Sequence, residues 1–207
     1  MEKEQTPFIQ EAKKRLDEIV DAIIKTTKAI EAVKNYPYEI THDGLLAAGK
    51  ACLKNPTENN IKILALAVYG WMPTALDCVV FDHDKIVKAI KCLGGNQPID
   101  SESATSHFEV LAGLLNNSYI GVSKFLYALW PERFAIFDSN VTHALNIACS
   151  KIRPGQGRKR KFFTDDANCL ERLIVYELAM RKAAPKRERS LREIELKLYT
   201  LGSAPSR

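Results

Sequence analysis

The stretch YIGVSKFLYALWPERFAIFDSNVTHAL, residues 119–145, decides the predicted fold of this chain. Its pattern predicts a turn, a short helix, an extended link and a second helix. Gly121 permits a tight hairpin, because glycine adopts backbone angles that other residues avoid. The first N–H groups of the helix after a hairpin have no partner inside that helix, and such groups attract anions. The stretch therefore predicts a site that binds a phosphate of the DNA backbone.

Two charged residues stand at the helix starts of this stretch. Lys124 enters at the start of the first predicted helix, and Asp138 stands at the start of the second. The link between them, residues 130–137, is rich in aromatic rings. This order predicts that a cation and a carboxylate face one cleft.

Residues 121–124, GVSK, and residues 136–145, IFDSNVTHAL, carry a family resemblance. They resemble the helix-hairpin-helix DNA glycosylase superfamily, in which a hairpin of the form LPGVGxK opens a helix and an Asp follows in a VDTHIxRV-like segment. The segment SKFLYALWPERFAIFDSNV is similar in sequence to small stand-alone bacterial proteins with an 8-oxoguanine-glycosylase-like fold, some of them antiviral. The chain has one glycine where the family hairpin has two, and its Lys-to-Asp spacing is shorter than in most members.

Apolar periodicity predicts an all-α chain of about nine helices, and no strand-like alternation of any length occurs. With 207 residues and 46% hydrophobic content, the chain can bury a core as one domain or as two lobes about a cleft. Helices are expected over 7–34 and after caps near Thr41, Thr57 and Asp82. The resemblance implies that residues 1–207 form one domain with a helix-hairpin-helix DNA glycosylase-like arrangement.

The chemistry that the resemblance implies is excision of a base that has been flipped out of duplex DNA. Asp138 would stabilise the positive charge that develops on the sugar, or activate water. Lys124 would attack the sugar as a nucleophile and give lyase activity, or it would bind a phosphate in a monofunctional enzyme, which is the preferred reading. Gly121, Val122 and Ser123 would grip the backbone. The plainer alternatives are an N-cap role for Asp138 and a solvated surface lysine at Lys124.

The positive charge is concentrated in the last third of the chain. From residue 151 onward there are 15 Lys and Arg against 7 Asp and Glu, a net charge of +8, and residues 1–150 carry −3. Residues 151–161 hold six cations and no acid, among them Arg153, Arg158, Lys159, Arg160 and Lys161. Neutralising phosphates releases counterions, so this loop is expected to lie along double-stranded DNA. A solvated surface loop is the compatible alternative.

Trp71 lies between Gly70 and Pro73, which are expected to end a predicted helix. It is a candidate for the wall of the base pocket. Stacking on an extruded base is worth ~1–3 kcal/mol. The plainer reading is that Trp71 belongs to the core, because large rings usually bury their area.

The remaining composition excludes several classes of protein. No apolar run approaches the ~20 residues of a membrane helix, and the first residues lack an apolar signal segment, so a cytoplasmic monomer is expected. Five scattered cysteines form no CxxC pair and are expected to be reduced core residues. Asp82 and His83 are expected to start a helix rather than hold a metal, and no cofactor is expected.

Three functions are consistent with these features. The first is a DNA glycosylase for an oxidised, alkylated or phage-modified base, such as a glucosylated cytosine, used in repair or antiviral defence. The second is a non-catalytic helix-hairpin-helix module that binds DNA. The third is an all-helical protein that binds another protein.

Overall fold

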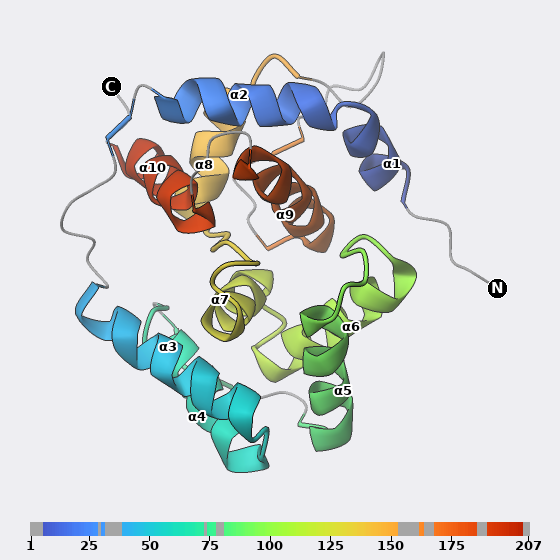
Figure 1. The fold of residues 1–207 in the computed structure, drawn as a ribbon, viewed down its shortest axis with the longest axis vertical. Coiled ribbons are helices and arrows are strands. Elements are labelled where there is room, and N and C mark those ends of the chain that lie inside the picture. The colour runs from blue at the N-terminus through green and yellow to red at the C-terminus, as the bar shows by residue number, and fades with distance from the viewer. Residues whose placement is uncertain are drawn as a thin grey trace. The chain divides into compact units, whose positions relative to one another are not determined.

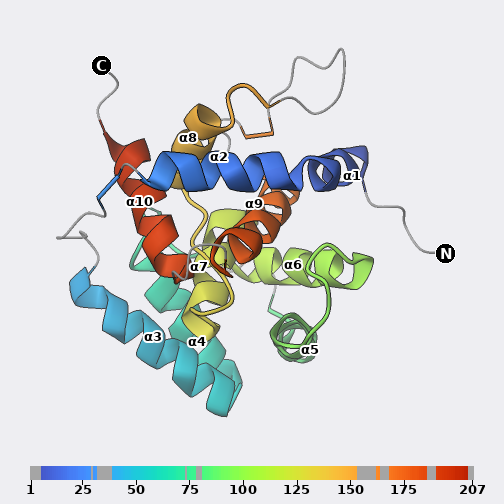
Figure 2. The same cartoon turned by 45° about the horizontal axis from the view of Figure 1, so that its top comes forward.

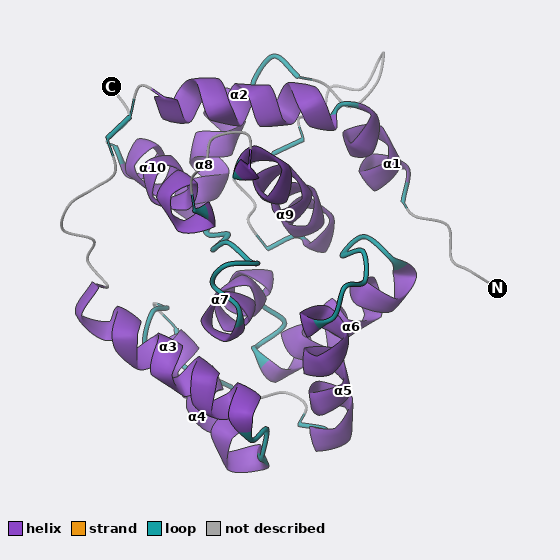
Figure 3. Cartoon of the chain, in the orientation of Figure 1, coloured by secondary structure: helices purple, strands orange, loops and turns teal. Residues whose placement is uncertain are grey.

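The computed structural model describes residues 6–28, 30–31, 39–72, 74–77, 81–152, 162–163, 168–185 and 190–204. Within these residues the regular structure is helical throughout, with ten helices and no strand, so the all-α prediction is confirmed (Figures 1 and 3). The helices are α1 (Pro7–Lys14), α2 (Leu16–Lys28), α3 (Glu39–Lys54), α4 (Glu58–Tyr69), α5 (His83–Gly94), α6 (Glu102–Leu114), α7 (Tyr119–Leu129), α8 (Ser139–Ala148), α9 (Leu170–Ala183) and α10 (Leu191–Ser203).

The first predicted helix, over 7–34, is divided in the structure. Arg15 leaves the helical region with φ −106° and ψ 15°, and it separates α1 from α2. The expected apolar stripe survives the break, because Ile9 and Ile19 on either side of Arg15 are both buried. The pattern therefore found the buried face correctly but not the interruption, which accounts for one helix more than the predicted nine.

Side-chain caps set several helix starts where the sequence placed them. The hydroxyl of Thr57 accepts from the Asn60 N–H at 3.3 Å, and the carboxylate of Asp82 accepts from the Lys85 N–H at 3.1 Å. Each cap satisfies an N–H that the first turn leaves open. α3 differs from the prediction, because it already includes Glu39 instead of opening at Thr41.

The chain divides into two compact units. Unit 1 comprises Met1–Lys34 and Ala135–Arg207 and holds α1, α2, α8, α9 and α10. Unit 2 comprises Asn35–Phe134 and holds α3 to α7. The division falls inside the link between α7 and α8, so the stretch that decided the prediction contributes to both units.

Unit 2 packs α3 against α4 and α7, and α5 against α6 (Figure 1). Its buried rings include Phe108 on α6 and Phe125 on α7. α3 meets α7 at Gly49, where an added Cβ would lie only 2.0 Å from the carbonyl oxygen of Ala128. Only glycine allows this approach of the two backbones.

In unit 1, α2 packs along α9, and α8 packs along α10 (Figure 2). Phe137 and Tyr176 are fully buried with ring centroids 5.1 Å apart. α8 and α10 meet at Gly202, where a Cβ would lie 1.7 Å from the carbonyl oxygen of Asn140. The same unit buries Ala135, Ile136 and Phe137, the last residues of the link before Asp138.

Candidate functional site

The turn between α6 and α7 is built by two asparagines. Asn116 and Asn117 both have φ 54°, in the left-handed region that asparagine tolerates better than most residues. The side chain of Asn116 accepts from the Asp77 N–H at 2.7 Å and donates to the Ala75 carbonyl at 2.9 Å. These bonds tie the turn to a neighbouring segment of unit 2. The turn that precedes Gly121 is therefore formed by asparagines.

Gly121 lies within α7 and does not form the hairpin, so that part of the prediction is wrong. Ser118 caps the helix, and its hydroxyl accepts from the Gly121 N–H at 3.0 Å. The two asparagines supply the left-handed backbone angles of the turn between α6 and α7, and no glycine is needed for them. A Cβ at Gly121 would lie 3.3 Å from the Leu115 Cβ, so the glycine permits close packing of helix on turn.

Val122 and Ser123 are fully buried on α7. The hydroxyl of Ser123 donates to the Ile120 carbonyl at 2.8 Å, within the same helix. Their side chains therefore belong to the core of unit 2. The Val122 N–H donates to the Ser118 carbonyl at 2.9 Å, so it is already used within this stretch.

Lys124 is buried in the middle of α7, with only 6% of its surface exposed. Its Nζ donates to the carbonyl oxygen of Trp71 at 2.8 Å. The alternative of a solvated lysine at a helix start is therefore wrong. Burying a charged amine is costly unless hydrogen bonds and charges compensate it, so this position is unusual for a lysine.

Trp71 is also buried, at 2% exposure, and its ring stacks on His42 with centroids 5.9 Å apart and planes 29° apart. The Nε2 of His42 lies 2.8 Å from the hydroxyl of Tyr127, which stands one helical turn after Lys124. The burial of Trp71 agrees with the plainer reading that it is a core ring. No sequence motif pointed to His42 or Tyr127. The spacing of three residues from Lys124 to Tyr127 was the available signal.

Asp138 is the N-cap of α8 in unit 1. Its Oδ1 accepts from the Val141 N–H at 2.9 Å, and its carbonyl oxygen accepts from the Thr142 hydroxyl at 2.7 Å. The capping interpretation is confirmed. The bond from Val141 orients the carboxylate of Asp138, a half-buried residue, and the bond from Thr142 holds its backbone.

Two neighbouring residues of α9 hold the extended link that precedes Asp138. Oε1 of Glu177 accepts from the Ala135 N–H at 3.1 Å, and the hydroxyl of Tyr176 donates to the Ile136 carbonyl at 3.1 Å. Both side chains are fully buried. No role was predicted for Glu177. The sequence signal for such a role was the position of Glu177, a charged residue among apolar ones in α9.

The environment of Glu177 favours its neutral form. Burial raises the pKa of Glu177 to about 8, against the opposing effects of Arg181 and of the bond from Ala135. Burial also raises the pKa of Tyr176 well above its usual value, and the charges of Glu195, Glu177 and Asp138 add to this effect. Glu177 is therefore mostly a neutral acid at pH 7, and its second oxygen has no hydrogen-bond partner among the described residues.

The free energy of unfolding is expected to fall as the pH rises from 5 to 8, and replacing Glu177 by Gln should make this fall smaller. The unfolded carboxyl releases its proton near pH 4.5 and the folded one near pH 8. Between these values the folded state binds more protons, so the free energy of unfolding falls by up to about 1.4 kcal/mol per pH unit. Glutamine keeps the acceptor for the Ala135 N–H but does not titrate. Urea unfolding of both proteins at pH 5 and pH 8 measures the difference, and parallel pH profiles would contradict the expectation.

The described cysteines are all free. Cys52 and Cys149 are buried, and burial raises the pKa of their thiols to about 11 and about 12. This confirms the core prediction for these two, whereas Cys92 and Cys169 are half-buried. Cys78 lies outside the described residues. No group of three His, Cys, Asp or Glu side chains that could hold a metal occurs in the part of the chain that the structure describes.

The predicted DNA-binding loop, with Arg153, Arg158, Lys159, Arg160 and Lys161, lies outside the described residues. Of the two predicted catalytic residues, Lys124 belongs to unit 2 and Asp138 to unit 1. Each is therefore placed within its own unit only.

Comparisons with known proteins give no relative for this chain. No protein-family model, curated protein or solved structure matches it. A search of the described helices for a membrane span finds none with the length and apolar character to cross a bilayer.

Proposed function

We propose that the protein is a DNA glycosylase, which extrudes a damaged or modified base and cleaves its bond to the sugar. The observation that carries the proposal is the burial of Lys124 on the helix that follows the asparagine turn. A desolvated lysine amine is the kind of group that can attack a sugar carbon. The Trp71 carbonyl, 2.8 Å from Nζ, orients this amine.

Asp138 supplies the second part of the chemistry. Cleavage of an N-glycosidic bond develops positive charge on the sugar, and a fixed carboxylate nearby lowers the energy of that state. The N-cap bond to Val141 holds Asp138 from one side. Tyr176 and Glu177 hold the backbone of the preceding link. A carboxylate held in this way needs little reorganisation when charge develops, or when it orients an attacking water molecule.

The proposal is tested by alkali-induced strand cleavage. The wild-type protein is incubated with duplexes that carry oxidised or alkylated bases and with heavily modified phage DNA. Base release leaves an abasic site, so breaks after alkali are expected for one substrate class. Breaks without alkali, together with a borohydride-trapped protein–DNA adduct that Lys124→Met cannot form, assign Lys124 as the nucleophile. Retention of DNA with no abasic product on any substrate would contradict the proposal.

The second candidate is a non-catalytic helix-hairpin-helix module that binds DNA. The specific observation in its favour is that the proposed catalytic groups already have structural roles. Lys124 donates to the Trp71 carbonyl inside a core, and Asp138 caps α8. This function predicts salt-sensitive DNA binding with no abasic product, so the assay above distinguishes the two candidates.

A further inference from the structure

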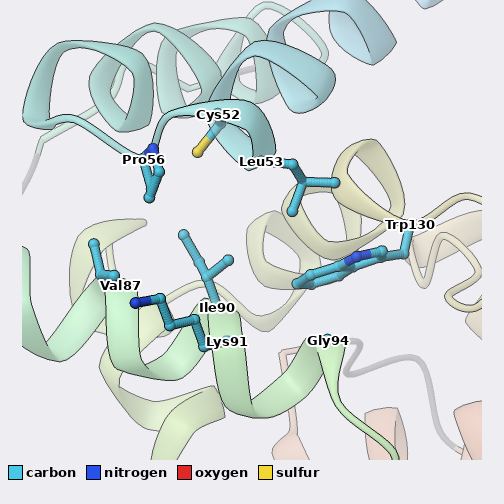
Figure 4. Close-up of a pocket in the computed structure, with 8 residues that line it drawn as sticks. All are labelled: Cys52, Leu53, Pro56, Val87, Ile90, Lys91, Gly94 and Trp130. Carbon is cyan, nitrogen blue, oxygen red and sulfur yellow. The ribbon is translucent and has the colours of Figure 1, made fainter.

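A pocket opens within unit 2 between α3 and α5 (Figure 4). Its volume is ≈ 290 Å³, and neither Lys124 nor Trp71 lines it. The residues that line it include Cys52, Leu53, Val87, Ile90, Lys91 and Trp130. The pocket is therefore separate from the residues of the proposed glycosylase chemistry.

The indole of Trp130 forms one wall of the pocket and is held firmly on one side. A Cβ at Gly94 would lie 2.4 Å from Cζ2 of Trp130, so the ring rests directly on the end of α5. Arg133 donates to the Gly94 carbonyl at 2.6 Å, and the Phe134 ring lies 6.0 Å from the indole. Trp130 nevertheless remains only half-buried. Figure 4 shows its ring lying between Gly94 and Leu53.

Apart from Lys91, the other lining side chains carry no formal charge at pH 7, and most of them are apolar. Leu53 is 38% exposed, although it stands beside an aromatic ring that could cover it. Ile90 on α5 points toward α3 across the pocket (Figure 4). Burial holds the pKa of the Cys52 thiol at about 11, so this wall is neutral at pH 7. Covering Leu53 and the indole with an apolar ligand would remove apolar surface from water, which is favourable.

The charge at the pocket is positive. Lys91 is exposed on α5 and lines the pocket, and none of the described residues that line it is an acid. The volume is roughly twice the ~150 Å³ of a cavity that holds one benzene ring. The volume, the indole surface and the positive charge of the pocket together indicate what kind of ligand fits it.

We propose that this pocket binds a flat aromatic anion of about two fused rings. The rings lie against the indole of Trp130 and the side chain of Leu53, and the anionic group points toward Lys91. Offset stacking on an indole adds to the gain from burial, and the ammonium of Lys91 selects against neutral ligands. The proposal is independent of glycosylase activity.

An NMR titration tests the proposal with two probes of the same shape, 2-naphthoate and the neutral 2-naphthamide. The full chain has two tryptophans, and Trp71 is buried at 2% exposure, so the two indole N–H signals report a pocket residue and a core residue. The variant Trp130→Phe assigns the signals. We expect 2-naphthoate to shift the Trp130 signal saturably and to leave the Trp71 signal in place, with 2-naphthamide binding more weakly.

Two lysine variants of α5 locate the charge effect. Lys91→Met keeps the apolar stem and should weaken 2-naphthoate binding by up to about five-fold, with 2-naphthamide unchanged. Lys88→Met removes an exposed cation one turn earlier, outside the pocket, and should change neither. The absence of a saturable Trp130 shift would overturn the proposal. Equal binding of both probes, or no effect of Lys91→Met, would also overturn it and indicate an apolar groove for a partner's side chain.

Discussion

Replacing Asp138 by Asn is expected to lower base release by at least about 100-fold while the fold and DNA binding persist. Asparagine is as good an N-cap as aspartate, so its side-chain oxygen can accept from the Val141 N–H as the carboxylate does at 2.9 Å. The variant therefore removes the negative charge and little else. Alkali-induced strand cleavage measures the loss, and a thermal unfolding curve checks the fold.

Asp82→Asn is the matched control for this experiment. Asp82 caps α5 in the same way, with its carboxylate accepting from the Lys85 N–H at 3.1 Å. If Asp138 acts only as a cap, the two variants should behave alike and both should retain activity. Full base release by Asp138→Asn would remove Asp138 from the mechanism.

Replacing Gly49 by Ala is expected to destabilise the protein by about 3 kcal/mol, the upper end of the usual cost of overpacking a core. The new Cβ would lie 2.0 Å from the Ala128 carbonyl oxygen and 2.5 Å from its carbon, and both are backbone atoms that cannot rotate away. α3 and α7 would have to separate, which opens the core that holds Lys124 and Tyr127. The midpoint of urea unfolding measures the effect.

Gly44→Ala, on the same helix, is the matched control, and it is expected to change stability in the opposite direction. No atom lies within 4 Å of the Cβ that would be added there, and the position is exposed. Alanine should therefore stabilise α3 by about 0.5–1 kcal/mol, because glycine loses more backbone freedom in a helix. If both glycines responded alike, the close approach of α3 to α7 would be wrong.

Local signals predicted much of the fold. Caps such as Thr57 and Asp82 act through residues three positions away, so their effect can be read from a short window of sequence. The break at Arg15 was missed, because the apolar stripe continues through it and periodicity carries no information about a single set of backbone angles.

The candidate site was less predictable, because its contacts join distant parts of the chain. Lys124 donates to the Trp71 carbonyl, and Glu177 on α9 accepts from the Ala135 N–H. No spacing rule connects these pairs. Gly121 was assigned to the hairpin from its residue type, whereas the two asparagines that precede it supply the turn.

Unit 1 is formed by two separate segments of the chain, so it cannot finish folding until the second segment has been synthesised. Unit 2 is continuous in sequence, so it can fold before the last helices have been made. α2 has to wait for α9, which begins at Leu170. At 5–20 residues per second this delay is on the order of ten seconds, and the apolar face of Ile19, Val20 and Ile23 remains uncovered by α9 throughout. During this time the apolar face of α2 is exposed to non-specific association with other apolar surfaces.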